Sequence, residues 1–226
     1  MVSAVIVAAG EGKRYGGEKQ FESLEGKPVI WYAVNPFLLH RLVEKVLLVV
    51  PGRFSGKLPS DLGLQRDERL KIVAGGERRQ DSVYNGLCEV PSSSDIVLVH
   101  DGVRPLLDGK LLDTVIKEVM KGTSVVPVIP VSDTVKEIDG VKVERTLDRH
   151  RLCCAQTPQA FPAELIRKAH ERARAMQLTY TDDAQLVESL GQEVRVVPGD
   201  RYNLKITSRL DLELASLLLR RVGGKR

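Results

Sequence analysis

The fold is decided at the start of the chain by residues 2–20, which read VSAVIVAAGEGKRYGGEKQ. Residues 2–9 form an almost continuous apolar run, which is typical of a strand covered on both faces. The glycines that follow let backbone N–H groups approach a phosphate closely, and Lys13, Arg14 and Lys19 add positive charge nearby. A buried strand that ends in a glycine-rich basic loop favours an α/β sheet with a nucleotide-phosphate site at its edge.

Two well-known phosphate loops do not fit this stretch. Lys13 and Lys27 each follow a glycine, but neither is followed by Ser or Thr, which excludes a Walker A loop. Gly10 and Gly12 begin a dinucleotide-binding pattern, yet the third glycine is not at the standard spacing and Pro28 opens the next helix late. The loop alone therefore leaves a phosphate site and a flexible basic loop open as alternatives.

The rest of the chain alternates strand and helix patterns. Apolar runs predict further strands at residues 46–50, 70–74, 96–99, 125–131 and 194–197. Helical patterns lie at residues 29–39, where Pro36 kinks or ends the helix, and at 82–88, 111–120, 163–176, 182–190 and 208–220. Ser208 and Asp211 resemble a capping box at the start of the last helix. This alternation predicts one domain, residues 1–226, with a mostly parallel sheet and helices on both faces.

Residues 132–149 break this rhythm. Residues 135–138 and 141–145 alternate apolar and polar side chains around Asp139-Gly140, a strong signal for a two-residue hairpin. A two-stranded hairpin is only marginally stable alone, so it needs a surface to pack against. It is either an edge hairpin folded onto its own domain or a projecting β-arm that embraces a second subunit, and the sequence leaves both open.

Composition limits the classes of function. The 226 residues are 42% hydrophobic, enough for one sizeable core, and Lys and Arg outnumber Asp and Glu by 34 to 30. This mild basic excess suits a protein that handles small phosphorylated molecules, and it also suits weak nucleic-acid contact. Aromatic residues make up only 4% and no interleaved stacking motif occurs, which disfavours a non-catalytic RNA-binding module.

The cysteines and the first residues of the chain indicate the cellular compartment in which the protein works. Cys88, Cys153 and Cys154 show no metal-ligand spacing, and the adjacent pair does not easily form a disulfide, so we expect a reducing cytoplasm. Residues 2–9 lack a basic leader and are far shorter than a bilayer-spanning helix, so we expect no membrane partner.

Polar side chains gather where other expected strands end. Gly75-Gly76 follows one strand and leads to Ser82, whose structural interpretation is a helix N-cap. Another strand ends at His100-Asp101. Asp101 suits Mg²⁺, which one or two carboxylates hold together with substrate phosphates, whereas a histidine there is more often packed than catalytic. The carboxyl ends of parallel strands meet at one edge, where α/β sheets bind ligands.

Taken together, these motifs resemble the methylerythritol-phosphate cytidylyltransferase family, among the nucleotidyltransferases with a Rossmann-like core. Five blocks match in order and span nearly the whole chain. They are Ala8-Ala9-Gly10 with Arg14 and Lys19-Gln20; Gly75-Gly76 with Arg79 and Ser82-Val83; His100-Asp101 with Arg104-Pro105; Asp133-Thr134 with Asp148-Arg149 and Thr157-Pro158-Gln159; and Thr181-Asp182 with Asn203-Leu204-Lys205. One block would be weak support, but five in register are specific.

The resemblance implies an activity and a set of roles. The implied enzyme is a Mg²⁺-dependent homodimer that moves CMP from CTP to 2-C-methyl-D-erythritol 4-phosphate in isoprenoid precursor biosynthesis. The catalytic residues that contact the CTP phosphates would be Arg14, Lys19 and Lys205. The other CTP-binding residues would be Ala9, Gly10, Gly76, Glu77 and Ser82, and Asp101 would be the metal ligand. The polyol phosphate would be bound by Arg104, Thr134, Arg149 and Thr157, with Thr134 and Arg149 reaching from the arm of a second subunit.

The chain departs from the family's pattern at two positions. Tyr202 stands where the family usually carries an acidic residue, a candidate metal contact, so either Asp200 compensates or Asp101 acts alone. Val103 stands where the family commonly has Ala, which would narrow the nucleotide pocket. A cytidylyltransferase for another polyol phosphate, such as ribitol 5-phosphate, is the nearest alternative because only the acceptor pocket would differ.

Overall fold

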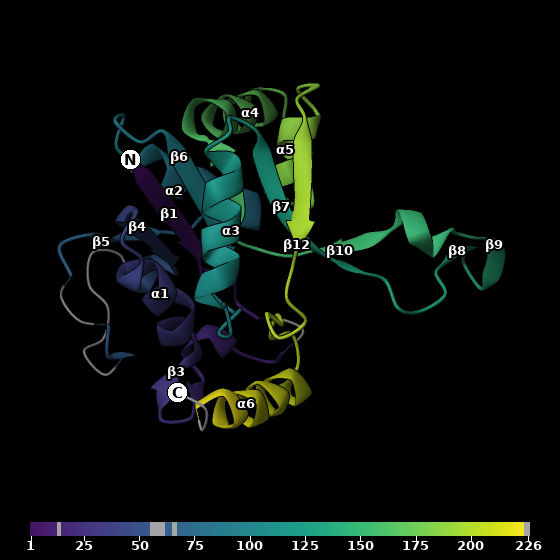
Figure 1. The fold of residues 1–226 in the computed structure, drawn as a ribbon, viewed down its shortest axis with the longest axis horizontal. Helices are drawn as coiled ribbons and strands as arrows, with labels where there is room; N and C mark the ends of the chain where they lie inside the picture. Colours follow the sequence, from purple (N-terminus) through teal and green to yellow (C-terminus); the bar gives the residue numbers. More distant parts are fainter. Residues whose placement is uncertain (13–14, 55–61, 65–66, 224–226) are drawn as a thin grey trace.

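The computed structural model describes residues 1–12, 15–54, 62–64 and 67–223. Within them, eight strands form a central sheet that runs through the body of the molecule (Figure 1). The strands of this sheet are β1 (Val2–Val7), β4 (Val43–Val50), β5 (Leu70–Ala74), β6 (Ile96–Asp101), β7 (Ser124–Pro130), β10 (Cys153–Ala155), β11 (Gln159–Pro162) and β12 (Val194–Pro198). The helices are α1 (Val29–Leu39), α2 (Arg79–Cys88), α3 (Gly109–Val119), α4 (Ala163–Ala175), α5 (Asp183–Glu188) and α6 (Arg209–Gly223).

The sheet is mostly parallel, as the sequence predicts. β1 pairs in parallel with β4 and β6, and β5 pairs in parallel with β4. β12 pairs in parallel with β7. β11 joins β6 to β7 and is antiparallel to both, and β10 is antiparallel to β7. The sequence does not predict β10 and β11, because strands of three and four residues are too short to show a periodic pattern.

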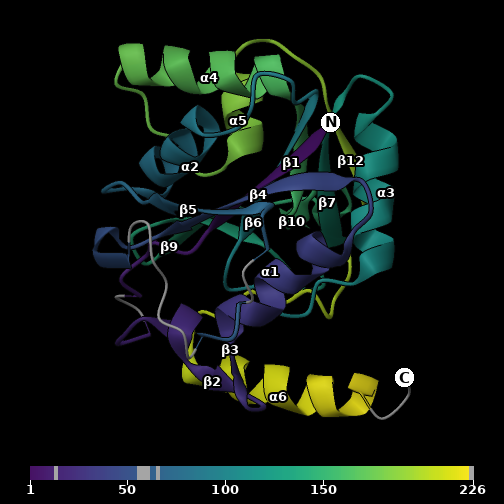
Figure 2. The same cartoon turned by 90° about the vertical axis from the view of Figure 1, so that its left-hand side faces the viewer.

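Two layers of helices cover the sheet, which confirms the expected architecture (Figure 2). α1 and α3 pack on one face and α2, α4 and α5 on the other. Side chains of β1 alternate between the two cores: Ala4 and Ile6 belong to the first, and Val5 belongs to the second. A strand that is buried on both faces explains why residues 2–9 read as a continuous apolar run.

Most predicted elements are confirmed to within a few residues. Pro36 lies inside α1 and does not end it. At the start of α6, Asp211 accepts the Ser208 N–H at 2.7 Å and donates its own N–H to the Ser208 hydroxyl at 3.3 Å, so the predicted capping box is present. The N-cap interpretation of Ser82 is wrong, because α2 begins three residues earlier and its N-cap is Arg78.

The hairpin predicted at residues 132–149 is also present. β8 (Lys136–Asp139) and β9 (Lys142–Thr146) form a separate antiparallel sheet that projects from the body (Figure 1). Every residue of both strands is exposed, including Ile138 and Val143. Of the two alternatives, an edge hairpin folded onto its own domain is therefore wrong, and the arm lacks support from its own chain.

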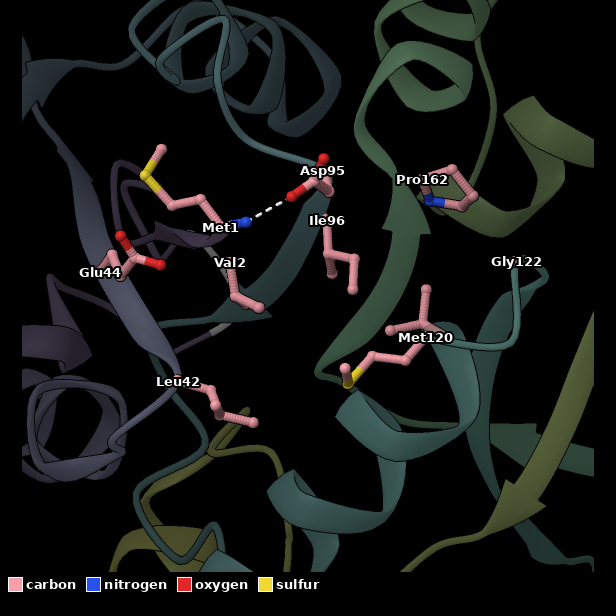
Figure 3. A pocket seen from close by; sticks show the side chains of 10 residues that line it. Met1, Val2, Leu42, Glu44, Asp95, Ile96, Met120, Gly122 and Pro162 are labelled. Atoms are coloured by element: carbon pink, nitrogen blue, oxygen red, sulfur yellow. Dashed lines mark hydrogen bonds and ion pairs between the residues drawn. The ribbon is translucent and has the colours of Figure 1, made fainter.

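The amino-terminal edge of the sheet carries a cavity of about 400 Å³ (Figure 3). Val2, Ile96 and Met120 line it with apolar side chains, and the amino group of Met1 forms an ion pair with Asp95 at its rim. This lining has no cluster of cationic side chains for a phosphate. Among the described residues, no helix is long and apolar enough to cross a bilayer.

Gly86 offers a test of the packing between α2 and the sheet. A Cβ added at Gly86 would lie 2.5 Å from Val5 Cγ1 and 3.0 Å from Val49 Cγ2. Gly86→Ala is therefore expected to lower the free energy of unfolding by about 1–3 kcal/mol, although Ala ordinarily favours a helix over Gly by about 1 kcal/mol. The midpoint of urea unfolding measures this change.

Gly109→Ala is the matched control. Gly109 is the first residue of α3, and a Cβ there would meet nothing within 4 Å. This variant is expected to unfold at the same urea concentration as the parent or higher. If Gly86→Ala were equally tolerated, the close approach of α2 to β1 and β4 would be contradicted.

Candidate active site

The second cavity lies at the opposite edge, where β1, β5 and β6 end. Its volume is about 580 Å³. Loops that follow these three strands line it, together with the segment before α6; the lining residues are Val7, Ala8, Ala9, Gly10, Glu11, Gly12, Lys19, Gln20, Gly76, Glu77, Arg78, Arg79, Ser82, Asp101, Val103 and Lys205. The cavity thus brings together Ala9, Gly10, Lys19, Gly76, Glu77, Ser82, Asp101 and Lys205, eight of the predicted site residues.

Backbone hydrogen bonds fix the loops around this cavity. The Ala8 N–H donates to the Val49 carbonyl at 2.7 Å, and the Gly75 N–H donates to the Val50 carbonyl at 2.8 Å. A Cβ on Gly75 would lie 2.2 Å from the Ala9 Cβ, so the first and second loops can touch only if Gly75 has no side chain. The rim is therefore a fixed surface of backbone.

The first loop carries the basic residues. The Gln20 amide donates to the Gly10 carbonyl at 3.1 Å, which ties the loop to the short 3₁₀ helix Lys19–Phe21. Lys19 begins this helix and lines the cavity. Arg14, predicted to contact phosphate, lies outside the described residues, as does Lys13.

The second loop leads from β5 into α2. The Ser82 hydroxyl is buried and accepts the Gly76 N–H at 3.1 Å, so Ser82 shapes the loop from inside the helix. Asp81 holds the helix start, because its carboxylate accepts the backbone N–H of the N-cap Arg78 at 3.2 Å and the Arg78 Nε–H at 2.8 Å. Glu77 is exposed at the cavity wall.

Three cations share the carboxylate of Asp101 at the end of β6. Oδ1 accepts the Arg79 Nε–H at 3.1 Å, and Oδ2 lies 3.3 Å from Arg104 Nε and 3.0 Å from Lys205 Nζ. The Asp101 side chain is only 8% exposed. Burial alone would raise the pKa of Asp101, but the charges of Arg79, Lys205 and Arg104 outweigh it and hold the pKa well below its usual range.

A buried hydrogen-bond chain supports Asp101 from behind. The Asp101 N–H donates to the Thr157 hydroxyl at 3.0 Å, and this hydroxyl lies 3.0 Å from His100 Nδ1. His100 Nε2 faces the Arg104 carbonyl at 3.4 Å, so the ring proton sits on Nε2 and Thr157 donates to Nδ1. Burial lowers the pKa of His100 to about 3, so the ring is neutral near pH 7. His100 is thus a packed histidine, as its position at a strand end predicts.

The segment before α6 delivers Lys205. The Asn203 amide donates to the Thr157 carbonyl at 2.8 Å, and the Asn203 carbonyl accepts Arg104 Nη1–H at 2.9 Å. The Ile206 N–H donates to the Val103 carbonyl at 2.9 Å. These three bonds tie the segment to the β6 end and direct Lys205 to the Asp101 carboxylate.

Two predicted residues lie elsewhere in a single chain. Thr134 and Arg149 are both exposed at the base of the arm, and Arg149 Nη1 donates to the Ser132 carbonyl at 2.8 Å. The arm points away from the body that holds Lys19 (Figure 1). One chain therefore does not bring Thr134 and Arg149 to the cavity.

The donor set at this edge is compatible with a phosphate-bound divalent ion. Among the described residues, no group of three or more His, Cys, Asp or Glu side chains could hold a metal unaided. A single carboxylate beside a phosphate cavity fits Mg²⁺, which takes its remaining ligands from substrate phosphates and water. Asp200 lines a different small cavity, where its carboxylate accepts the Tyr202 N–H at 2.9 Å.

The sequence motifs assign no separate role to Arg79, although it belongs to one of the five matching blocks. Arg79 is the first residue of the helix that follows β5, so its place at the carboxyl edge of the sheet is a signal that the sequence offers. Asp183, which contacts Arg79 from behind, and His170, which contacts Asp183, give no such signal, because 104 residues separate Asp183 from Arg79.

Comparison with known proteins agrees with this geometry. The family model for 2-C-methyl-D-erythritol 4-phosphate cytidylyltransferase matches residues 2–221. Proteins of that name from Dictyoglomus thermophilum and Clostridium botulinum are 39% and 40% identical, over 93% and 98% of this chain and 93% and 100% of theirs. The crystal structure of 4-diphosphocytidyl-2C-methyl-D-erythritol synthase from Anaerococcus prevotii superposes with a TM-score of 0.86 at 30% identity and covers 97% of this chain and 96% of its own. This chain belongs to the 2-C-methyl-D-erythritol 4-phosphate cytidylyltransferase family.

Proposed function

We propose that this chain transfers CMP from CTP to 2-C-methyl-D-erythritol 4-phosphate and releases pyrophosphate, in non-mevalonate isoprenoid precursor biosynthesis. The observation that carries the proposal is the cavity at the carboxyl edge. Its glycine-rich backbone, Lys19 and Lys205 offer N–H donors and positive charge to a triphosphate. The family match over residues 2–221 supplies the identity of the nucleotide and the acceptor.

The CTP phosphates are the groups that Lys19 and Lys205 would bind, with Arg14 as a third cation. Charge builds on the α-phosphate and on the departing pyrophosphate as the reaction proceeds, and fixed cations in a partly enclosed site stabilise that charge. The cytidine would lie against Ala9, Gly10, Gly76, Glu77 and Ser82, all of which line the cavity. Val103 also lines it, and its two methyl groups take space from the nucleotide.

The acceptor needs no general base. A phosphate monoester is largely dianionic at neutral pH because its second pKa is about 6, so its oxygen attacks the α-phosphorus directly. A new oxygen–phosphorus bond forms, the bond from the α-phosphorus to the bridging oxygen breaks, and pyrophosphate leaves with the electron pair. A neutral, fully hydrogen-bonded His100 fits a reaction without a protein base.

Arg104 and Thr157 are the residues of the same subunit that we assign to the acceptor phosphate. Both are buried beside Asp101, and Arg104 is held by the Asn203 carbonyl. Arg104 would offer its guanidinium to that phosphate, and the Thr157 hydroxyl, which donates to His100 and accepts the Asp101 N–H, would hold the neighbouring backbone in place.

Mg²⁺ is the ion that we assign to Asp101. Bound to the triphosphate, it would neutralise part of the charge that develops on the leaving pyrophosphate. Asp101 would hold it through its carboxylate, which lines the cavity.

We also assign the chain to the cytoplasm. Cys88, Cys153 and Cys154 are all free and exposed. Exposed thiols persist in reducing compartments and form disulfides in oxidising ones.

The function is tested by pyrophosphate release with four nucleoside triphosphates against several polyol phosphates. We expect CTP with 2-C-methyl-D-erythritol 4-phosphate to give the highest kcat/KM. Lys19→Ala is expected to lose about 10²-fold in kcat, since its charge acts mainly on the transition state. A higher kcat/KM with ribitol 5-phosphate would show that the proposed acceptor is wrong. RNA binding without any CTP turnover would overturn the enzyme assignment.

The metal assignment is tested by titrating Mg²⁺ against Asp101→Asn. An amide oxygen is a poorer ligand than a carboxylate, so half-maximal activity is expected at about 10-fold higher Mg²⁺ or more. The substitution also leaves three cations without their shared anion, so kcat falls as well. A change in kcat at an unchanged Mg²⁺ requirement, or full parental activity in excess chelator, would contradict the assignment.

We propose a homodimer in which the arm completes the partner's site. The exposed arm carries Ile138, Val141 and Val143 without cover, and two-stranded hairpins are marginal alone. The acceptor residues Thr134 and Arg149 flank β8 and β9 in the chain, are exposed and do not line the cavity of their own chain. A two-fold dimer with exchanged arms would supply both missing parts at once.

Subunit complementation tests this arrangement. Arg149→Ala and Lys19→Ala are each expected to be nearly inactive as homodimers. After equal amounts exchange subunits, half of the dimers are mixed, and each mixed dimer has one site with both residues intact. About a quarter of the parental activity should return, by counting sites in a two-fold dimer. Complete subunit exchange with no recovery would show that each arm serves its own chain.

A further inference from the structure

Arg79 connects the Asp101 carboxylate to a second, deeper carboxylate. Its Nε–H donates to Asp101 Oδ1 at 3.1 Å, and its Nη1–H donates to Asp183 Oδ2 at 2.8 Å. Asp183 in turn contacts His170 Nε2 through Oδ1 at 3.1 Å. The Arg79 side chain is 30% exposed and lines the cavity, whereas those of Asp183 and His170 are 1% exposed. The four side chains form a line from the cavity into the core.

This line joins three helices on one face of the sheet. Arg79 comes from α2, His170 from α4 and Asp183 from α5, which lie together in Figure 2. A buried carboxylate without partners is very costly, so a fully buried Asp183 is stable only with its two bonds to Arg79 and His170. Burial would raise the pKa of Asp183, but Arg79 and the His170 hydrogen bond outweigh it and lower the pKa.

His170 is oriented by this single contact. Its Nδ1 is buried and has no hydrogen-bond partner among the residues that the structure describes. The carboxylate of Asp183 can only accept, so the ring proton must lie on Nε2. A buried histidine whose only polar contact is a carboxylate acts as a support for that carboxylate.

α5 does not depend on Asp183 for its position. The neighbouring Asp182 caps the helix by accepting the Gln185 N–H at 2.9 Å and the Gln159 amide N–H at 2.8 Å. The Ala184 N–H donates back to the Gln159 side-chain oxygen at 3.1 Å. The carboxylate of Asp183 is therefore committed to Arg79 and His170.

We propose that Asp183 is a positioning residue for CMP transfer: it divides the Arg79 guanidinium between two carboxylates, and His170 holds it in place. This inference rests on the proposed function. With Asp183 present, Arg79 takes Oδ1 of Asp101 and leaves Oδ2 to Lys205 and Arg104. Without it, the guanidinium fork has one carboxylate left and turns to bind both oxygens of Asp101, because bidentate pairing is the preferred arrangement. Lys205 and Arg104 then lose their anchor.

The charge change gives the proposal a distinctive signature. Asp183→Asn removes one negative charge behind a cavity that binds an anion, so CTP binding should stay equal or tighten. The misplaced cations should lower kcat by about 10-fold or more, since small errors of position are costly in catalysis. A merely structural defect would instead weaken CTP binding and lower kcat together.

Asp182→Asn is the matched control, one residue away at the N-cap of the same helix. It is expected to keep kcat within about twofold of the parent, because no contact joins Asp182 to Arg79 among the described residues. Asp183→Glu keeps the charge and is expected to recover part of the activity that Asn loses. CTP affinity is measured by calorimetry and kcat by pyrophosphate release at saturating substrates.

A second pair of variants serves if Asp183→Asn does not fold. His170→Gln keeps an N–H donor at the reach of Nε2, and His170→Met has the same length without a donor. We expect Gln to stay within about twofold of the parental kcat and Met to lose about tenfold or more, the cost of one hydrogen bond to a charged group.

The proposal is overturned if Asp183→Asn keeps the parental kcat, or if Asp182→Asn loses as much kcat as Asp183→Asn. It is also overturned if CTP binding of Asp183→Asn weakens in step with its kcat, or if His170→Gln and His170→Met have the same kcat. The parent enzyme in the same assay separates this result from the proposed function. A parent that turns over CTP while Asp183→Asn is unimpaired refutes only the positioning role, whereas a parent without turnover removes both.

Discussion

The sharing of one buried carboxylate among three cations is the constraint on which the site depends. Asp101 ends β6, and Arg79, Arg104 and Lys205 reach it from α2, from the loop after β6 and from the segment before α6. Like charges repel, so these cations can gather in a small volume only around an anion. The cavity therefore presents concentrated positive charge to a phosphate ligand before any ligand binds.

The Asp101 site also depends on hydrogen bonds between segments that are far apart in the chain. Thr157 accepts the Asp101 N–H and offers its carbonyl to Asn203, so the loop between β10 and β11 fixes both the carboxylate and the segment that carries Lys205. Each of these partners lies at least 46 residues from the next along the chain. The site thus forms only when the whole sheet is assembled, and no single loop could form it alone.

The sequence predicts the parts of this protein that local chemistry determines. The two-sided burial of β1, the hairpin at Asp139-Gly140 and the capping box of α6 each follow from residues close together in the chain. Contacts that form only in the folded protein decide what it does not predict. Ser82 has the composition of an N-cap, yet Gly76 takes its hydroxyl and Arg78 caps the helix. The position of the Arg79 guanidinium is fixed by its hydrogen bond to Asp183, which lies 104 residues away in the chain.

The antiparallel strand β11 has a consequence for the order in which the protein can fold. The strands β1, β4, β5 and β6 all come from residues 2–101, so they can pair before the rest of the chain is synthesised. β6 then presents an unpaired, wholly apolar stretch, Ile96–Val99, until residues 159–162 emerge and cover it. An open edge of this kind is where nascent chains pair wrongly with one another. Rapid closure by β11 would therefore shorten the exposure of the β6 edge, which otherwise lasts for at least the synthesis of about sixty residues.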